Sequence, residues 1–178
     1  MTEPAVLRTE RLVLRPWTDA DREPFAAMGQ DPEVMRYFPG PLDRAASDGF
    51  VNRCMQRFAD AGWGLWVVDS GGFRGFTGLN PVPPALPFAP AVEVGWRLAR
   101  DAWGHGYATE AARAALSYGF DVIGLDEIVS FTATINVPSI AVMQRLGMTR
   151  DAAEDFDHPA VPVGHPVRRH VLYRLPRP

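Results

Sequence analysis

Two glycines, Gly104 and Gly106, stand between a predicted strand at 91–99 and a predicted helix at 109–123. A helix that begins directly after a strand and a tight turn leaves several backbone N–H groups unpaired and aimed at one point. Their dipoles favour an anion, and glycine lets a phosphate approach the backbone closely. The segment predicts a phosphate or pyrophosphate site, with a tight turn of purely structural glycines as the alternative.

Two common nucleotide-binding patterns do not fit this turn. A Walker loop requires GxxxxGK[ST], and no lysine or serine follows the glycines in that way. A dinucleotide-binding turn requires GxGxxG/A, whereas Thr109 occupies the third position here. Asp126 provides an acid at about the expected distance, but it precedes the next predicted strand instead of ending it. We therefore interpret the dinucleotide match as accidental.

Hydrophobic periodicity predicts the elements that precede the glycine turn. Alternating apolar residues indicate a strand at 11–17, and helical spacing indicates helices at 20–29 and 42–62. The segment 64–79 is typical of a hairpin, because Ser-Gly-Gly joins two apolar runs. The proline-rich segment 80–90 is expected to be an irregular loop, since each proline lacks a backbone donor.

After the glycine turn, the pattern predicts a strand at 127–134, a short helix at 139–147 and a terminal strand at 169–175. An irregular link at 154–166 precedes the last strand. This order predicts an α/β (α+β) fold around one mixed sheet, and the length suits a single domain over 1–178.

Composition excludes several classes of protein. The net charge is −3, which disfavours nucleic acid as the main partner because phosphate binding needs a clustered basic surface. No apolar run approaches the about 18 residues that span a bilayer, and the start of the chain lacks a signal-peptide pattern. We expect a cytoplasmic protein with no membrane partner. Cys54 is the single cysteine, so no internal disulfide is possible, and its helical spacing indicates a buried hydrophobe.

The stretch "WGHGYATE" at 103–110 resembles the pyrophosphate loop of the GNAT acyl-CoA N-acyltransferases, Gln/Arg-x-x-Gly-x-Gly/Ala. Trp103 replaces the polar first residue, as in the branch of the ribosomal-protein N-terminal acetyltransferases (RimJ/RimL-like). "NVPSIAVMQRLGM" at 136–148 resembles the second signature of the family, Asn-x-x-Ser before a short helix that ends in Lys/Arg-Leu-Gly-Phe/Met. "TERLVLRPW" at 9–17 resembles the first strand of the branch. The chain is identified as similar to this superfamily over nearly its whole length.

The resemblance implies a GNAT acyl-CoA N-acyltransferase fold, with a mixed, mostly antiparallel sheet flanked by helices. The sheet would splay between its fourth and fifth strands, 92–98 and 128–134, with acetyl-CoA wedged between them. The pantetheine arm would pair with the main chain around Leu98. The pyrophosphate would bind the backbone N–H groups of the glycine turn, which comprises Gly104, His105, Gly106, Tyr107, Ala108 and Thr109.

Two side chains near this cofactor have alternative interpretations. His105 occupies the slot where the branch often has lysine, so it could contact a phosphate or simply lie in solvent. Asn136 resembles the asparagine that hydrogen-bonds the cofactor, and it could equally cap the helix before Pro138, or do both.

The implied reaction is direct attack of a neutral amine on the thioester, with a backbone N–H of the fourth strand as oxyanion donor. Deprotonating a lysine-type amine at pH 7 costs roughly 4 to 5 kcal/mol, whereas an α-amine costs only about 1 to 1.5 kcal/mol. Glu93, on the fourth strand, is the candidate base, with a structural role as the alternative. Many relatives use a tyrosine acid where this chain has Met143. Ser139 is the remaining candidate acid, or only a cap.

The acceptor is predicted to be a primary amine. The branch resemblance favours the α-amine of a protein or peptide; a small-molecule amine (antibiotic, polyamine or amino acid) and a catalytically silent acyl-CoA-binding module are the alternatives. His158, His165 and His170 match no metal-ligand spacing, so we predict no metal. We expect a monomer or homodimer. Six aromatic residues could line an acceptor pocket or belong to the core, namely Trp17, Tyr37, Phe38, Trp63, Trp66 and Trp96.

Overall fold

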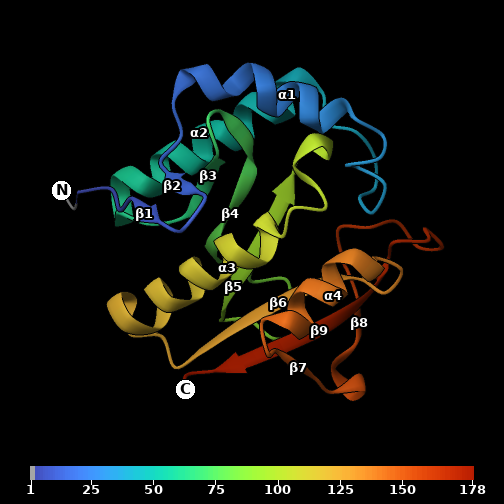
Figure 1. The fold of residues 1–178 in the computed structure, drawn as a ribbon. Coiled ribbons are helices and arrows are strands. Elements are labelled where there is room, and N and C mark those ends of the chain that lie inside the picture. Colours follow the sequence, from blue (N-terminus) through green and yellow to red (C-terminus); the bar gives the residue numbers. More distant parts are fainter. Residues whose placement is uncertain (1–2) are drawn as a thin grey trace.

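The computed structural model describes residues 3–178 as one mixed, mostly antiparallel sheet with helices on both sides (Figure 1). The strands follow the order β1-β2-β3-β4-β5-β6-β9-β7, with β8 paired to β9. Their bounds are β1 Leu7–Arg8, β2 Val13–Arg15, β3 Leu65–Asp69, β4 Phe73–Pro81, β5 Val92–Leu98, β6 Glu127–Ala133, β7 Thr149–Arg150, β8 Phe156–Asp157 and β9 Arg169–Pro176. The predicted fold class is confirmed.

The longer helices are α1 Arg22–Gln30, α2 Arg44–Ala61, α3 Tyr107–Tyr118 and α4 Val137–Arg145. Figure 1 shows α1 and α2 side by side on one side of the sheet and α3 on the other. The first pair is held to β4 by an aromatic cluster, in which Phe25 and Phe50 stack at 4.9 Å between ring centroids and both contact Phe76. Cys54 is buried, as predicted. None of the helices within residues 3–178 is both long and apolar enough to cross a membrane.

Most element boundaries agree with the prediction, and the exceptions have local causes. The helix predicted at 109–123 begins at Tyr107, because Gly106 adopts a left-handed φ of 78° and acts as its N-cap. Its last turn, Gly119–Ile123, is a π-helix. The helix predicted at 139–147 begins at Val137, since Pro138 fits the first turn of a helix. The strand predicted at 11–17 shortens to β2, and the irregular link contains β8.

The strands β5 and β6 meet at a single parallel pair, Glu93 opposite Val129. Each is fully paired on its other side, β5 with β4 and β6 with β9. Beyond that pair, the hydroxyl of Ser130 donates to the carbonyl of Val94 at 2.9 Å. The sheet therefore opens between β5 and β6, where the sequence places the splay.

Candidate active site

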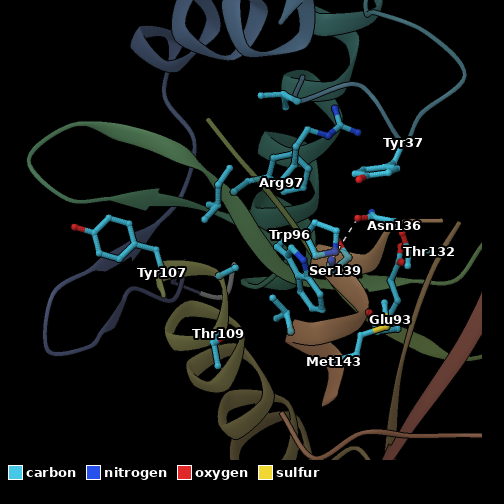
Figure 2. Close-up of a pocket in the computed structure, with 18 of the residues that line it drawn as sticks. Tyr37, Glu93, Trp96, Arg97, Tyr107, Thr109, Thr132, Asn136, Ser139 and Met143 are labelled. Carbon is cyan, nitrogen blue, oxygen red and sulfur yellow. Dashed lines mark hydrogen bonds between the residues drawn. The ribbon is translucent and has the colours of Figure 1, made fainter. Parts of the chain in front are cut away.

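A cleft of about 1650 Å³ opens at this splay. It is lined by β5, β6, the starts of α3 and α4, and the loop 31–43 between α1 and α2. In Figure 2, Glu93, Asn136, Ser139 and Met143 gather on one side of the cleft, and Thr109 lies on α3 at the other. All predicted site residues except His105 line this one cleft.

The glycine turn presents unpaired donors to the cleft. Gly104 and Gly106 both have a φ of 78°, the left-handed region that suits glycine. The first hydrogen bond of α3 runs from the N–H of Glu110 to the carbonyl of Gly106, at 3.1 Å. The N–H groups of Tyr107, Ala108 and Thr109 precede that bond and have no partner within the helix. Such a turn is suited to bind a phosphate group.

A polar brace that the sequence analysis missed holds this turn in place. The carboxylate of Glu110 accepts from Thr9 Oγ1 at 2.6 Å, from the backbone N–H of Arg11 at 3.0 Å and from Arg11 Nε at 2.7 Å. Arg11 Nη1 also donates to the carbonyl of His105 at 2.8 Å. The turn before β2 is therefore tied to the glycine turn. The sequence does not show this brace, because its two ends lie about a hundred residues apart. Both ends nevertheless belong to segments that resemble family motifs, 9–17 and 103–110.

His105 lies outside the residues that line the cleft. Its exposed ring stacks on that of Tyr107, with centroids 5.3 Å apart. The hydroxyl of Tyr107 lies 3.4 Å from Ser70 Oγ, and its ring points away from the cleft in Figure 2. At both residues, the backbone and not the ring is the part that can bind an anion at the glycine turn.

The carbonyl of Leu98 is already occupied, because the indole Nε1 of Trp103 donates to it at 2.9 Å. This bond folds the exposed Trp103 back on the end of β5. A ligand that pairs with the β5 edge would therefore need other main-chain groups near Leu98.

Trp96 offers such groups. The N–H of Ala99 donates to Arg74 in β4, and main-chain groups alternate in direction along a strand. Odd-numbered residues of β5 therefore bond β4, whereas the main chain of Trp96 points to the open side. The bond from Ser130 on β6 to Val94 agrees with this direction. The N–H and carbonyl of Trp96 are free to pair with an extended ligand.

Glu93 is half-buried on β5, where it forms the single β5–β6 pair with Val129. Burial raises the pKa of its carboxyl to about 7, and a hydrogen bond from Asn80 Nδ2, at 3.3 Å, partly opposes that rise. Asn80 lies directly opposite Glu93 on β4. A carboxyl with this pKa exchanges a proton readily near neutral pH, which is the property of a general base.

Asn136 and Ser139 stand at the start of α4. Asn136 is the N-cap, and its Oδ1 accepts from the backbone N–H of Ser139 at 3.3 Å. Its Nδ2 donates to Thr132 Oγ1 on β6 at 2.8 Å. The cap interpretation of Asn136 is therefore confirmed, and Ser139 is not the cap. The half-buried Ser139 lines the cleft, and Figure 2 shows its bond to Asn136.

The remaining aromatic candidates divide between the core and the cleft. Tyr37, Phe38 and Trp96 line the cleft, whereas Trp17 and Trp66 are buried in the core. The ring of Trp63 packs against the guanidinium of Arg57, 4.0 Å from its centroid. Met143, buried at the position where many relatives have tyrosine, lines the cleft but has no proton to donate.

The histidines that follow α4 form hydrogen bonds and ring contacts within the C-terminal segment of the chain. His158 and His165 accept backbone N–H groups through Nδ1, at 3.2 and 3.3 Å. The rings of His158 and His170 lie 5.0 Å apart, and both residues line the cleft. Among residues 3–178, no group of three or more histidine, cysteine or acidic residues is arranged to hold a metal ion.

The cleft and fold agree with comparisons to known proteins. The family model described as "Acetyltransferase (GNAT) domain" matches residues 11–149, and the chain belongs to this family. The protein is accordingly an acetyl-CoA-dependent N-acetyltransferase.

Three individual proteins illustrate the match. The Bacillus subtilis protein YkkB is 34% identical over 146 residues, which cover 80% of this chain and 84% of that protein. An "FsC-acetyl coenzyme A-N(2)-transacetylase" of Aspergillus fumigatus is 36% identical over 80% of this chain and 64% of its own length. The crystal structure of a GNAT-family acetyltransferase from Bacillus anthracis superimposes with a TM-score of 0.79 at 26% identity, covering 97% of this chain and 99% of that one.

Proposed function

We propose that the protein transfers the acetyl group of acetyl-CoA directly to a neutral primary amine in the cleft between β5 and β6. The observation that carries this proposal is the position of Glu93. Its buried carboxyl, with a pKa of about 7, lines the same cleft as the unpaired N–H groups of the glycine turn. One group is suited to accept a proton and the other to hold a pyrophosphate.

The cofactor would run from α3 to the splay. Backbone N–H groups from Gly104 to Thr109 would hold the pyrophosphate, with the backbone but not the ring of His105 taking part. The pantetheine arm would donate to the free main-chain carbonyl of Trp96 beside Leu98, because an amide-containing chain adds to an open strand edge. Asn136 would serve as helix cap and place its remaining amide hydrogen near the cofactor.

The Trp96 N–H would donate to the thioester oxygen as negative charge develops there, since a fixed backbone donor needs no reorganisation. Glu93 would accept the proton of the attacking amine, directly or through water. A thiol is a much stronger acid than an alcohol, with a pKa of about 8.5 for the cysteine side chain, so the CoA thiolate leaves readily and needs little help from an acid. Ser139 is the candidate acid that would protonate the thiolate. Many relatives use a tyrosine for this step, at the position where this chain has Met143.

We infer that the acceptor nitrogen is an α-amine, on the strength of the RimJ/RimL-like turn "WGHGYATE". An α-amine needs little from a base, which suits a cleft with one buried carboxyl. A small-molecule amine is the alternative within the same reaction class. The alternative to an enzyme is an acyl-CoA-binding module without activity, because Met143 stands where many relatives have a tyrosine acid. We further propose that 1–178 form one cytoplasmic domain that acts without a metal.

Thiol release from acetyl-CoA over a panel of amines and N-terminal peptides separates these possibilities. We expect release above background for α-amines, with acetylated product in equal amount. Preferred turnover of polyamines would support the small-molecule alternative. Tight CoA binding with no release for any acceptor would contradict the proposed activity and support the binding module.

Replacing Ser139 with alanine tests the acid role. Because the Asn136 cap uses the backbone N–H of residue 139, the Ser139→Ala variant keeps that bond and the fold. We expect turnover to fall by roughly threefold to tenfold with CoA affinity unchanged, since the thiolate needs little protonation. Unchanged turnover in steady-state assays would remove Ser139 from the mechanism.

Replacing Glu110 with glutamine tests the brace of the glycine turn. The variant loses the ion pair with Arg11, which measures 2.6 Å to Nη2, while keeping the size of the side chain. We expect CoA to bind about threefold to tenfold more weakly by calorimetry, because the turn is less ordered before binding. Full affinity in a folded Glu110→Gln protein would show that the brace does not order the cofactor turn.

A further inference from the structure

The reaction above gives no role to Arg97, a charged side chain of the cleft. Arg97 lies on β5 and lines the cleft, yet its Nε and Nη1 atoms are buried and have no hydrogen-bond partner among the described residues. Buried donors are nearly always paired in folded proteins, and unpaired charged donors are especially unfavourable. We therefore expect the hydrogen-bond partner of this guanidinium to be a ligand.

The contacts of Arg97 hold its guanidinium without using its donors. The ring of Phe38 lies 4.0 Å from the guanidinium carbon, and that of Phe76 lies 5.5 Å away. A guanidinium packs against aromatic rings through its face, whereas its N–H donors point outward in its plane. The stacking fixes the position of the charge without using the in-plane donors, of which Nε and Nη1 are buried and unpaired.

The neighbours of Arg97 on β5 leave room for a ligand. Glu93, Gly95 and Arg97 alternate along the strand, so they lie on the same face of the sheet. A Cβ atom placed on Gly95 would meet nothing within 4 Å, and Gly95 itself lines the cleft. Open space thus separates a candidate base from a cation, each about 6.6 Å along the strand from the glycine. In Figure 2, the Arg97 guanidinium extends away from Glu93, on the side of Tyr37.

We propose that Arg97 binds a carboxylate of the acceptor, so that the substrates are primary amines that carry a carboxylate a few bonds from the nitrogen. This inference rests on the proposed function, because it places the reacting amine between Glu93 and Arg97. A guanidinium pairs with a carboxylate through Nη2 and either Nε or Nη1, so a bound carboxylate would satisfy one of the two orphaned donors. It also repels a second positive charge, which disfavours polyamines as acceptors.

The cation is present under working conditions. Burial lowers the pKa of Arg97 to about 10, so the guanidinium stays protonated at neutral pH. Because it is held in a partly desolvated site, pairing it with a carboxylate gives more discrimination than a surface ion pair. We expect a preference of about tenfold or more for a carboxylate over the matching amide.

The experiment compares matched pairs of acceptors that differ in a single carboxylate: γ-aminobutyrate with its amide, and C-terminally amidated tripeptides that begin with glutamate with those that begin with glutamine. The readout is the ratio of kcat/KM within each pair, measured by thiol release. We expect the wild-type protein to favour the carboxylate by about tenfold or more and Arg97→Gln to reduce the ratio to about one. Arg97→Lys keeps the charge and should retain part of the preference. The pair that shows the larger ratio distinguishes a free amino acid from a peptide.

Arg100→Gln is the matched control, because it removes an exposed guanidinium outside the residues that line the cleft. It should leave the selectivity ratio unchanged. Glutarate, a dicarboxylate without an amine, tests binding directly by calorimetry on the CoA-bound protein. We expect it to bind the wild-type protein and to bind Arg97→Gln at least about tenfold more weakly.

Two results would overturn the inference: a wild-type ratio near one in both pairs, or equal glutarate affinity in the wild-type and Arg97→Gln proteins. Either leaves the proposed function intact if neutral amines are acetylated. Conversely, absence of acetylation with any acceptor, together with Arg97-dependent glutarate binding, would contradict the proposed function and support the carboxylate site. If Arg97→Gln does not fold, Arg97→Lys and the wild-type ratio still decide the question.

Discussion

The Glu93→Gln variant should lose about a hundredfold in kcat while binding CoA as tightly as the wild-type protein. Glutamine keeps the shape of the side chain and a partner for Asn80, but it cannot accept a proton from the amine. A general base contributes about 10² to 10⁴ in rate, and the low end fits an α-amine that needs little deprotonation. Thiol release at saturating acceptor measures the loss.

The pH profile identifies the group responsible. Since the pKa of Glu93 is raised to about 7, it is protonated and inactive as a base below that pH. The kcat/KM of the wild-type protein should therefore fall tenfold per unit between the pKa of the amine and about 7, and about a hundredfold per unit below about 7, where both Glu93 and the amine bind protons. In Glu93→Gln, this limb should vanish and leave only the titration of the amine. A wild-type profile without a group near 7, or the same limb in the variant, would show that Glu93 is not the base.

Unfolding experiments provide an independent check on the same carboxyl. Its pKa is higher in the folded state than in the unfolded chain, so the folded state binds the proton more tightly. The stability that this proton contributes is present below the unfolded pKa of about 4.3 and is lost as pH rises through about 7. The loss amounts to at most about 4 kcal/mol and should be absent in Glu93→Gln. Denaturant titrations at several pH values measure it.

The Gly106→Val variant should lose CoA affinity by more than about a hundredfold while remaining folded. Gly106 has a φ of 78°, which costs a β-branched residue at least about 1 to 2 kcal/mol. Relief of that strain would turn the N–H groups of the first turn of α3 away from a common point. Each charge-assisted hydrogen bond contributes about 1.5 to 3 kcal/mol, so losing two accounts for the effect. Calorimetry with CoA measures it.

Gly124→Val is the matched control for this substitution. Gly124 has a φ of 80° and lies outside the residues that line the cleft, so it imposes the same backbone strain away from the cofactor. The two variants should lose similar thermal stability, but only Gly106→Val should lose CoA. Equal CoA affinity in both variants would remove the glycine turn from the site.

The fold was largely predictable from the sequence because it depends on periodicity and on turn residues. The hairpin of β3 and β4 and the end of α2 at Gly62 follow from glycines in positive-φ conformations. The start of α3 was misplaced by two residues, since nothing in the sequence distinguishes a helical Tyr107 from one in the preceding turn. The motifs also predicted a cofactor site at the glycine turn, which lines the same cleft as Glu93.

What the sequence could not supply depends on contacts between distant segments. The brace at Glu110 joins it to Thr9 and Arg11, and the raised pKa of Glu93 depends on burial that only packing creates. Arg97 sits in a strand with ordinary alternation, and its unpaired donors are invisible until the loop 31–43 covers it with Phe38.

A crystal structure with CoA tests the central claim most directly, namely that the splay between β5 and β6 presents the thioester to Glu93. We expect the pyrophosphate within hydrogen-bond distance of the N–H groups of the turn 104–109. The pantetheine should pair with the Trp96 main chain, and the sulfur should lie at the splay beside Glu93. A pyrophosphate bound elsewhere, or a sulfur out of reach of both the Trp96 N–H and Glu93, would contradict the account.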